Sequence, residues 1–116
     1  MSVKTTIEIE KGAQLLKLLG DKTRLSMMKL LHTNECCVCE LVEIYQASQP
    51  SISQHLRKLK DADLLKERRR GQWIFYSANT ESAHYEFISG VLESLPSQDP
   101  HLENLEKQGL RISCCE

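Results

Sequence analysis

Apolar residues recur at spacings of three and four along much of the chain, which is the pattern of helices that bury one face. The pattern predicts five helices, at about 10–19, 22–32, 38–45, 50–61 and 80–95. Gly20 ends the first helix, Asp21 is placed to cap the second, and Pro96 stops the last. Residues 46–49 form a turn between the third and fourth helices, so these two helices are expected to make a helix-turn-helix.

A segment rich in aromatic residues after the fourth helix predicts a β-hairpin. In LLKERRRGQWIFYSA two extended runs flank Gly71, and Trp73, Phe75 and Tyr76 are concentrated in the second run. The first strand and the tip are basic, so this wing is suited to the DNA backbone or the minor groove. The elements together predict a mostly α winged helix-turn-helix fold, with about five helices and a two-stranded β-hairpin wing.

The chain is expected to form one domain, because 116 residues can bury one modest core. Residues 1–96 are interpreted as the DNA-binding and dimerisation domain. Residues 97–116 are interpreted as an acidic tail with some helical potential, which ends in the pair Cys114 and Cys115. No apolar run is long enough to span a membrane, and the first residues lack a secretory pattern. The expected compartment is therefore the cytoplasm, where thiols stay reduced.

Charge is distributed unevenly along the chain. The net charge of −1 argues by itself against a nucleic-acid-binding protein. However, residues 54–72 hold seven Lys or Arg against three Asp or Glu, whereas residues 80–116 hold two against seven. A basic segment beside an acidic one indicates a protein with one DNA-facing side, and an ordinary solvated charge run is the alternative interpretation.

The fourth helix is the candidate for reading DNA. Ile52, Leu56 and Leu59 form its buried stripe, and its outer face has no acidic residue before Asp61. We expect the first half of that face to meet base edges and the arginines and lysine to hold phosphates. The base-edge residues are Ser51, Gln54 and His55, the phosphate residues are Arg57, Lys58, Arg68, Arg69 and Arg70, and Ser48, Gln49 and Ser53 complete the predicted DNA-binding set.

Three cysteines within four residues, Cys36, Cys37 and Cys39, directly precede the helix-turn-helix. Soft ligands beside DNA-reading helices predict a sensor of a metal, a metalloid or a redox state. In a regular helix residues two apart point about 200° apart, so Cys37 and Cys39 would not converge on one ion. Either Cys36 acts with Cys39 on a helical start, or the segment is non-helical and all three bind. In the second arrangement, a ligand held by Cys37 and Cys39 would prevent or unwind the first turn of the third helix.

The motifs LLGDKTRLSMMKLL, CVCEL, SQPSISQHLRKLKDADLL and RRRGQWIFYS, in that order, resemble the ArsR/SmtB family of winged helix-turn-helix repressors over about residues 10–95. The CVCEL segment resembles the arsenic-sensing subgroup. The resemblance implies a homodimer that binds double-stranded operator DNA and dissociates when a toxic metal or metalloid binds Cys37 and Cys39. In one arsenic subgroup a third cysteine follows three residues later, where this chain has Val42. The third thiolate is therefore expected from Cys36, or from Cys114 or Cys115.

The sequence thus predicts a repressor that responds to arsenite, As(III), with no cofactor required and no membrane partner. Antimonite, Sb(III), and Cd(II) are further candidate inducers. A redox or reactive-sulfur sensor on the same fold is the alternative. An enzyme with a nucleophilic cysteine is disfavoured, because no Cys–His arrangement is visible. The family's other metal site, on the last helix, is also disfavoured, because His84 alone matches its spacing.

Overall fold

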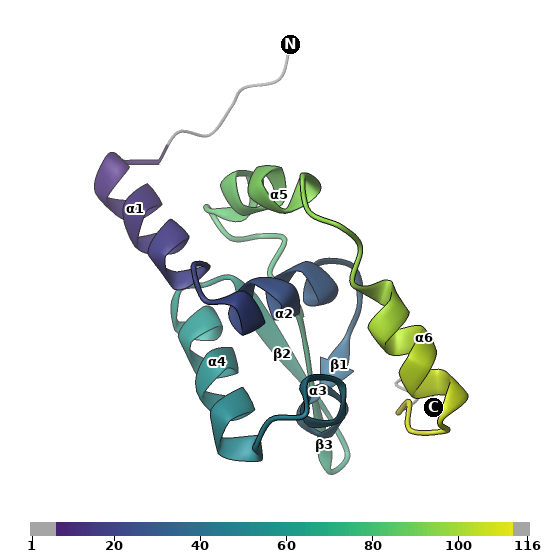
Figure 1. The fold of residues 1–116 in the computed structure, drawn as a ribbon. Coiled ribbons are helices and arrows are strands. Elements are labelled where there is room, and N and C mark those ends of the chain that lie inside the picture. Colours follow the sequence, from purple (N-terminus) through teal and green to yellow (C-terminus); the bar gives the residue numbers. More distant parts are fainter. Residues whose placement is uncertain (1–6, 113–116) are drawn as a thin grey trace.

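The computed structural model describes residues 7–112, which contain six helices and a three-stranded antiparallel sheet (Figure 1). The helices are α1 (Ile9–Leu18), α2 (Lys22–Thr33), α3 (Val38–Tyr45), α4 (Gln49–Asp61), α5 (Tyr85–Glu93) and α6 (Asp99–Lys107). The strands are β1 (Cys36–Cys37), β2 (Leu65–Arg70) and β3 (Trp73–Ala78). The predicted mostly α fold, a helix-turn-helix followed by a hairpin wing, is confirmed.

Side-chain caps set where the helices of the DNA-reading unit begin. The Asp21 carboxylate accepts a hydrogen bond from the Arg24 backbone N–H at 3.0 Å and starts α2. The Ser48 hydroxyl accepts one from the Ser51 backbone N–H at 3.2 Å and starts α4. Gln46 ends α3 in the left-handed region, at φ 50°, and turns the chain toward α4. The short turn between α3 and α4 is thus fixed at both ends.

The wing is a regular hairpin that gains one strand the sequence pattern did not predict. β2 and β3 pair from Leu65 opposite Ala78 to Arg70 opposite Trp73, and Gly71, at φ 59°, makes the tight turn. β1 adds to the free edge of β3 by pairing Cys36 with Tyr76. The two cysteines that precede α3 are therefore held by the wing's sheet.

The core lies between α2, α4 and the sheet, and the last helix packs onto it. Met28 and Leu31 of α2 and Leu59 of α4 are buried in one cluster with Ala78 of β3. The segment expected to be an acidic tail contains α6, whose Leu102 and Leu105 are also buried. Helix α6 contacts α3, so the helical potential of this tail is realised against the helix that follows the thiols.

The prediction that the fifth helix begins near residue 80 is wrong by about one turn, since α5 starts at Tyr85. Two polar side chains hold the preceding residues in turns instead. Asn79 accepts a hydrogen bond from the backbone N–H of Glu81 at 3.2 Å, and Ser82 accepts one from that of His84 at 3.0 Å. Within residues 7–112, every helix is too short or too polar to cross a membrane.

Candidate thiol site and DNA-facing surface

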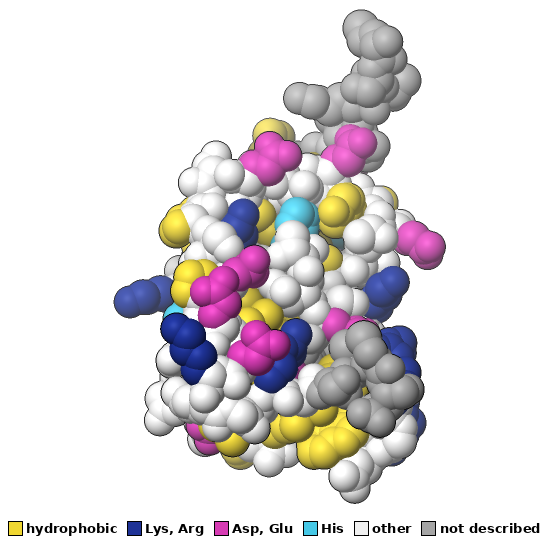
Figure 2. Space-filling model, turned by 90° about the vertical axis from the view of Figure 1, so that its right-hand side faces the viewer, with side chains coloured by type: hydrophobic (Ala, Val, Ile, Leu, Met, Phe, Trp, Pro, Cys, Tyr) yellow, Lys and Arg dark blue, Asp and Glu magenta, His cyan; other side chains and the backbone are white. Residues whose placement is uncertain are grey.

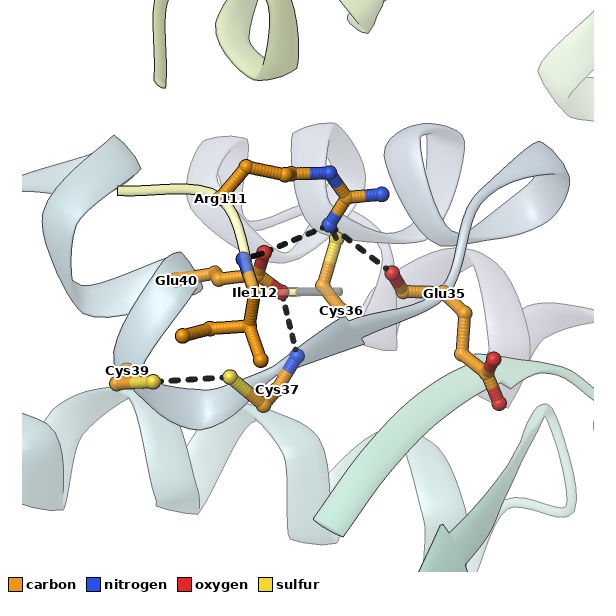
Figure 3. Close-up of polar contacts among 7 residues, drawn as sticks. All are labelled: Glu35, Cys36, Cys37, Cys39, Glu40, Arg111 and Ile112. Carbon is orange, nitrogen blue, oxygen red and sulfur yellow. Dashed lines mark hydrogen bonds and ion pairs between the residues drawn. The ribbon is translucent and has the colours of Figure 1, made fainter. Parts of the chain in front are cut away.

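Cys37 and Cys39, called here the thiol pair, bring their sulfur atoms to 2.9 Å from each other (Figure 3). Cys37 is the N-cap of α3, with extended backbone at φ −93° and ψ 168°, and Cys39 is the second residue of the helix. The 200° separation of a regular helix therefore does not apply to them. The backbone is extended at Cys36 and Cys37, and the two sulfur atoms of the thiol pair meet while the first turn of α3 is intact. Which of the three thiols bind a ligand stays a prediction.

Cys36 does not join the thiol pair. Successive side chains of a strand point to opposite faces, and the Cys36 sulfur lies on the side of β1 away from Cys37, 4.0 Å from Nη1 of Arg111. Its side chain is fully buried in the core. Among residues 7–112 no three Cys, His, Asp or Glu side chains are grouped closely enough to hold a metal ion. Cys114 and Cys115, the other predicted candidates for a third ligand, lie outside the described residues.

The Cys37 thiol is protonated at neutral pH. Burial, the hydrogen bond with Cys39 and the negative charge of Glu40 together raise the pKa of this thiol to about 12, and the hydrogen bond from the Glu40 backbone N–H opposes them. Cys39 is exposed at the surface of α3. A soft ligand reaching this site meets one accessible thiol and one enclosed thiol whose proton must leave on binding.

Glu40 is the one buried charged residue in the described chain, and it lies directly behind the thiol pair. One carboxylate oxygen accepts a hydrogen bond from the Cys37 backbone N–H at 3.0 Å, which completes a capping box at the start of α3. The other oxygen accepts from Arg111 Nη1 and from the Ile112 backbone N–H, each at 2.7 Å (Figure 3). No local sequence pattern indicates this role of Glu40, because its partner Arg111 is 71 residues away.

A pocket of about 460 Å³ opens beside the thiol pair. Its walls include Trp73 and Ile74 of the wing, Val42 of α3 and Gln49, the first residue of α4. A ligand held by the thiols would therefore lie against the recognition helix and the wing together.

Most of the predicted DNA-binding residues of α4 lie on its outer face, and their contacts with DNA stay a prediction. Gln49, Ser53, Gln54, Arg57 and Lys58 are exposed, Ser51 is half-buried, and Ser48 uses its hydroxyl as the N-cap. His55 is turned toward α2, where its Nδ1 lies 3.2 Å from Nη1 of Arg24. Burial lowers the His55 pKa, the nearby Asp21 raises it, and the positive charge of Arg24 lowers it. A neutral His55 that accepts from Arg24 ties the recognition helix to α2.

The three arginines of the wing are not equivalent. Arg68 makes a two-pronged ion pair with Glu35, at 2.9 Å from Nε and 2.8 Å from Nη2, and its guanidinium lies over the Phe75 ring at 5.7 Å. Arg69 is exposed and Arg70 is half-buried. On the side of the molecule where α6 lies, acidic side chains are spread among scattered basic ones (Figure 2). The face formed by α4 and the wing stays the predicted DNA-binding surface.

Known proteins are similar to this chain in both sequence and fold. Residues 21–67 match the model described as "Bacterial regulatory protein, arsR family". The arsenic resistance transcriptional regulator ArsR1 of Pseudomonas putida is 37% identical over 98 residues, which cover 84% of this chain and 73% of that protein. This chain belongs to the arsR family of bacterial regulatory proteins. ArsR2 of the same organism is 36% identical over 106 residues, 85% of this chain and 92% of that protein.

Solved structures of winged-helix regulators agree with this membership. Reduced HlyU from Vibrio cholerae has a TM-score of 0.63 and 29% identity, and the match covers 73% of this chain and 88% of that chain. The transcriptional repressor BigR from Xylella fastidiosa has a TM-score of 0.61 and 28% identity, over 76% of this chain and 89% of that chain. This arsR-family member is therefore a DNA-binding transcriptional regulator and not an enzyme.

Proposed function

We propose that this protein is an arsenite-responsive repressor that binds operator DNA as a homodimer in the cytoplasm and releases it when arsenite binds Cys37 and Cys39. The observation that carries the proposal is the 2.9 Å approach of two thiols beside the recognition helix. Relatives named as arsenic resistance regulators support the same ligand. No cofactor is required, and Sb(III) and Cd(II) are secondary candidates for the inducer.

The chemistry of the thiol pair favours a soft, thiophilic ligand. Two sulfur atoms at this distance can both bond to one arsenic atom, and the nearest carboxylate, Glu40, has both of its oxygens occupied by hydrogen bonds. Hard cations prefer oxygen ligands, which the pocket offers only at Glu43 and at the side-chain amides of Gln49 and Gln72. The site is thus better suited to arsenite than to magnesium or calcium.

The position of the pocket suggests how arsenite binding could be coupled to DNA binding. Arsenite bound to both sulfur atoms would draw them apart from their 2.9 Å contact and load the first turn of α3. Helix α3 packs on α4, and Gln49 of α4 forms part of the pocket wall. A small displacement at the thiol pair therefore changes the placement of the recognition helix relative to the wing.

The test uses a duplex enriched from a random DNA library by rounds of binding to the wild-type protein, called here the selected duplex. Cys37→Ser and Cys39→Ser are expected to bind it with wild-type affinity and to keep it at arsenite concentrations that release the wild type. Fluorescence anisotropy measures both quantities. Cys36→Ala is the control and should still release, since its sulfur faces away from the pair.

The same assay distinguishes an arsenite sensor from a redox sensor. Wild-type protein is titrated with arsenite, antimonite, cadmium, lead, zinc and peroxide. Release by arsenite that a competing dithiol reverses supports the proposal. Release by peroxide with no response to arsenite would instead establish a redox sensor, since Cys37 and Cys39 are close enough to react with each other. Unchanged release from Cys37→Ser would show that the thiol pair is not the site.

A further inference from the structure

A second pocket lies between α2, the C-terminal end of α3 and the segment that leads into α6, and its volume is about 360 Å³. We call it the α2–α6 pocket. It shares no wall residue with the pocket beside the thiol pair, and none of its wall residues belongs to the predicted DNA-binding set. Cavities of this size hold small organic molecules in other proteins.

The walls of the α2–α6 pocket combine apolar surface with positive charge. Leu25 and Leu95 provide apolar surface, and Lys22 and Lys29 bring ammonium groups to the same cavity. Lys29 donates one hydrogen bond to the backbone oxygen of Leu92 at 2.9 Å, and an ammonium group has two further N–H donors. None of the described residues that line the pocket is acidic. This combination matches a ligand with an apolar body and a negative charge.

One edge of the pocket is held in place by hydrogen bonds. The Ser26 hydroxyl donates to Oε1 of Gln98 at 2.7 Å, so its single proton is used and the Tyr45 hydroxyl donates to Ser26 at 2.8 Å. Burial is the main cause that raises the pKa of Tyr45 to about 12, against the hydrogen bond with Ser26, so the phenol keeps its proton. The His101 ring lies 5.6 Å from the Tyr45 ring. A ligand therefore meets aromatic rings that are already placed.

We propose that the α2–α6 pocket is a second effector site, which binds a small organic acid. The apolar body of the acid would pack on Leu25, Leu95 and the Tyr45 ring, and its carboxylate would accept hydrogen bonds from Lys22 and Lys29. This inference goes beyond arsenite sensing and uses neither thiol of the pair. An inorganic anion would meet the same lysines but would leave the apolar walls uncovered.

A ligand in this pocket would act on the recognition unit from the end of α3 opposite the thiol pair. Tyr45 is the last residue of α3, and Gln46 then turns the chain toward α4. The bond between Tyr45 and Ser26 ties this turn to α2, while α6 packs on α3 from the other side of the pocket. Occupation of the pocket should therefore change the placement of α4 and the affinity for DNA.

The ligand class is tested on the full chain with chosen probes by isothermal titration calorimetry. We expect 2-naphthoate to bind, and 2-naphthylmethanol, 2-naphthylmethylamine and acetate to bind at least about tenfold more weakly, because each lacks either the negative charge or the apolar body. Binding of the alcohol or the amine as tight as that of 2-naphthoate would overturn the assignment, as would equal binding of acetate. So would the absence of binding by benzoate, octanoate and 2-naphthoate alike.

Charge variants locate the probe within the molecule. Lys22→Glu and Lys29→Met should each weaken 2-naphthoate binding by roughly tenfold. Lys22 is exposed and is the first residue of α2, where an acidic side chain suits the helix dipole, so this variant is expected to fold. Lys107→Glu makes the same charge change at an exposed position of α6 outside the pocket and should leave binding unchanged. Wild-type binding by both pocket variants would place the acid elsewhere and overturn the proposal.

The effector role is measured by fluorescence anisotropy with the selected duplex. Saturating 2-naphthoate should change the affinity for this duplex by roughly fivefold or more. Cys37→Ser should respond to 2-naphthoate as the wild type does, because its side chain lines the other pocket. Binding of 2-naphthoate with no change in DNA affinity would overturn the effector role. Failure of arsenite to release DNA would contradict only the proposed function, since the response to 2-naphthoate does not depend on the thiol pair.

Discussion

Arg68 and Arg69 are neighbours in β2, yet their side chains point to opposite faces of the hairpin. Arg68 is committed to Glu35, the residue before β1, and to the face of the Phe75 ring. Arg69 is exposed on the other face, opposite Ile74 of β3. Because a strand alternates its faces, a run of three arginines cannot act as one uniform basic patch. We therefore assign DNA contact to Arg69 and support of the β1 segment to Arg68.

This assignment gives a matched pair of variants. Arg69→Ala should weaken binding to the selected duplex and to random duplexes alike, and should flatten the slope of log affinity against log salt by about 0.9 for one lost phosphate contact. Arg68→Ala removes the same charge and should leave the salt slope nearly unchanged. Anisotropy over a salt series measures both. Equal flattening by the two variants would show that the ion pair with Glu35 opens on DNA.

Helix α3 is the element that would connect the proposed thiol sensor to the predicted DNA-reading helix. Its first turn carries the thiol pair, its N-terminal cap is closed by Glu40, and its C-terminal end turns directly into α4. A helix of eight residues has few internal hydrogen bonds, so its stability comes from these end contacts and from packing. A ligand that disturbs the N-terminal end of α3 would therefore be expected to shift the whole helix.

Helices α1 and α5 are the elements we assign to dimerisation. They adjoin where Phe87 of α5 approaches Gly12 of α1. Ile9 and Leu16 of α1 are 89% and 49% exposed, which is unusual for large apolar side chains. A two-fold axis through this surface would bury them and would place two recognition helices on half-sites about one helical turn of DNA apart.

A charge placed on that surface should separate the protomers. Leu16→Glu is expected to shift wild-type dimers to monomers in sedimentation velocity and to lower affinity for the selected duplex, because each half-site then binds alone. Gln14→Glu adds the same charge to an exposed position of α1 and serves as the control. Monomeric wild type with tight DNA binding, or a dimer unaffected by Leu16→Glu, would argue against this interface.

The sequence predicted the elements that depend on local patterns and missed those that depend on distant partners. The stripe of Ile52, Leu56 and Leu59 defined α4 because helical periodicity is visible within one segment. Strand β1 is two residues long and exists through pairing with β3, so no local signal marks it. The start of α5 was misplaced because side-chain bonds of Asn79 and Ser82 outcompete helix formation.

In the candidate site, too, the sequence predicted the local features and missed those that depend on distant residues. The spacing of Cys37 and Cys39 indicated a ligand pair, but assuming a regular helix hid that Cys37 is the N-cap and can meet Cys39. The direction of Cys36 depends on β1, and the role of Glu40 depends on Arg111, far along the chain. Such long-range polar contacts leave no periodic trace in a sequence.

At the scale of the whole molecule, the thiol pocket, the recognition helix and the wing form one continuous surface. The pocket touches α3, α4 and the wing at once, and β1 joins the cysteines to the wing's sheet. The acidic residues of α5 and α6 lie outside the surface predicted to bind DNA. Occupation of the pocket and occupation of the DNA-facing surface are therefore expected to oppose each other through a coupling free energy, which must act equally in both directions.

Because the coupling must act equally in both directions, the most direct test is to measure how DNA changes the affinity for arsenite. The arsenite dissociation constant is determined for the free protein and for the protein saturated with the selected duplex. We predict that the DNA-bound protein binds arsenite more weakly, by the same factor as arsenite weakens DNA binding, which is roughly 5–150-fold for typical coupled sites. Equal arsenite affinity in the two states would mean that the thiol pair and the recognition helix are not coupled, and would contradict the central claim.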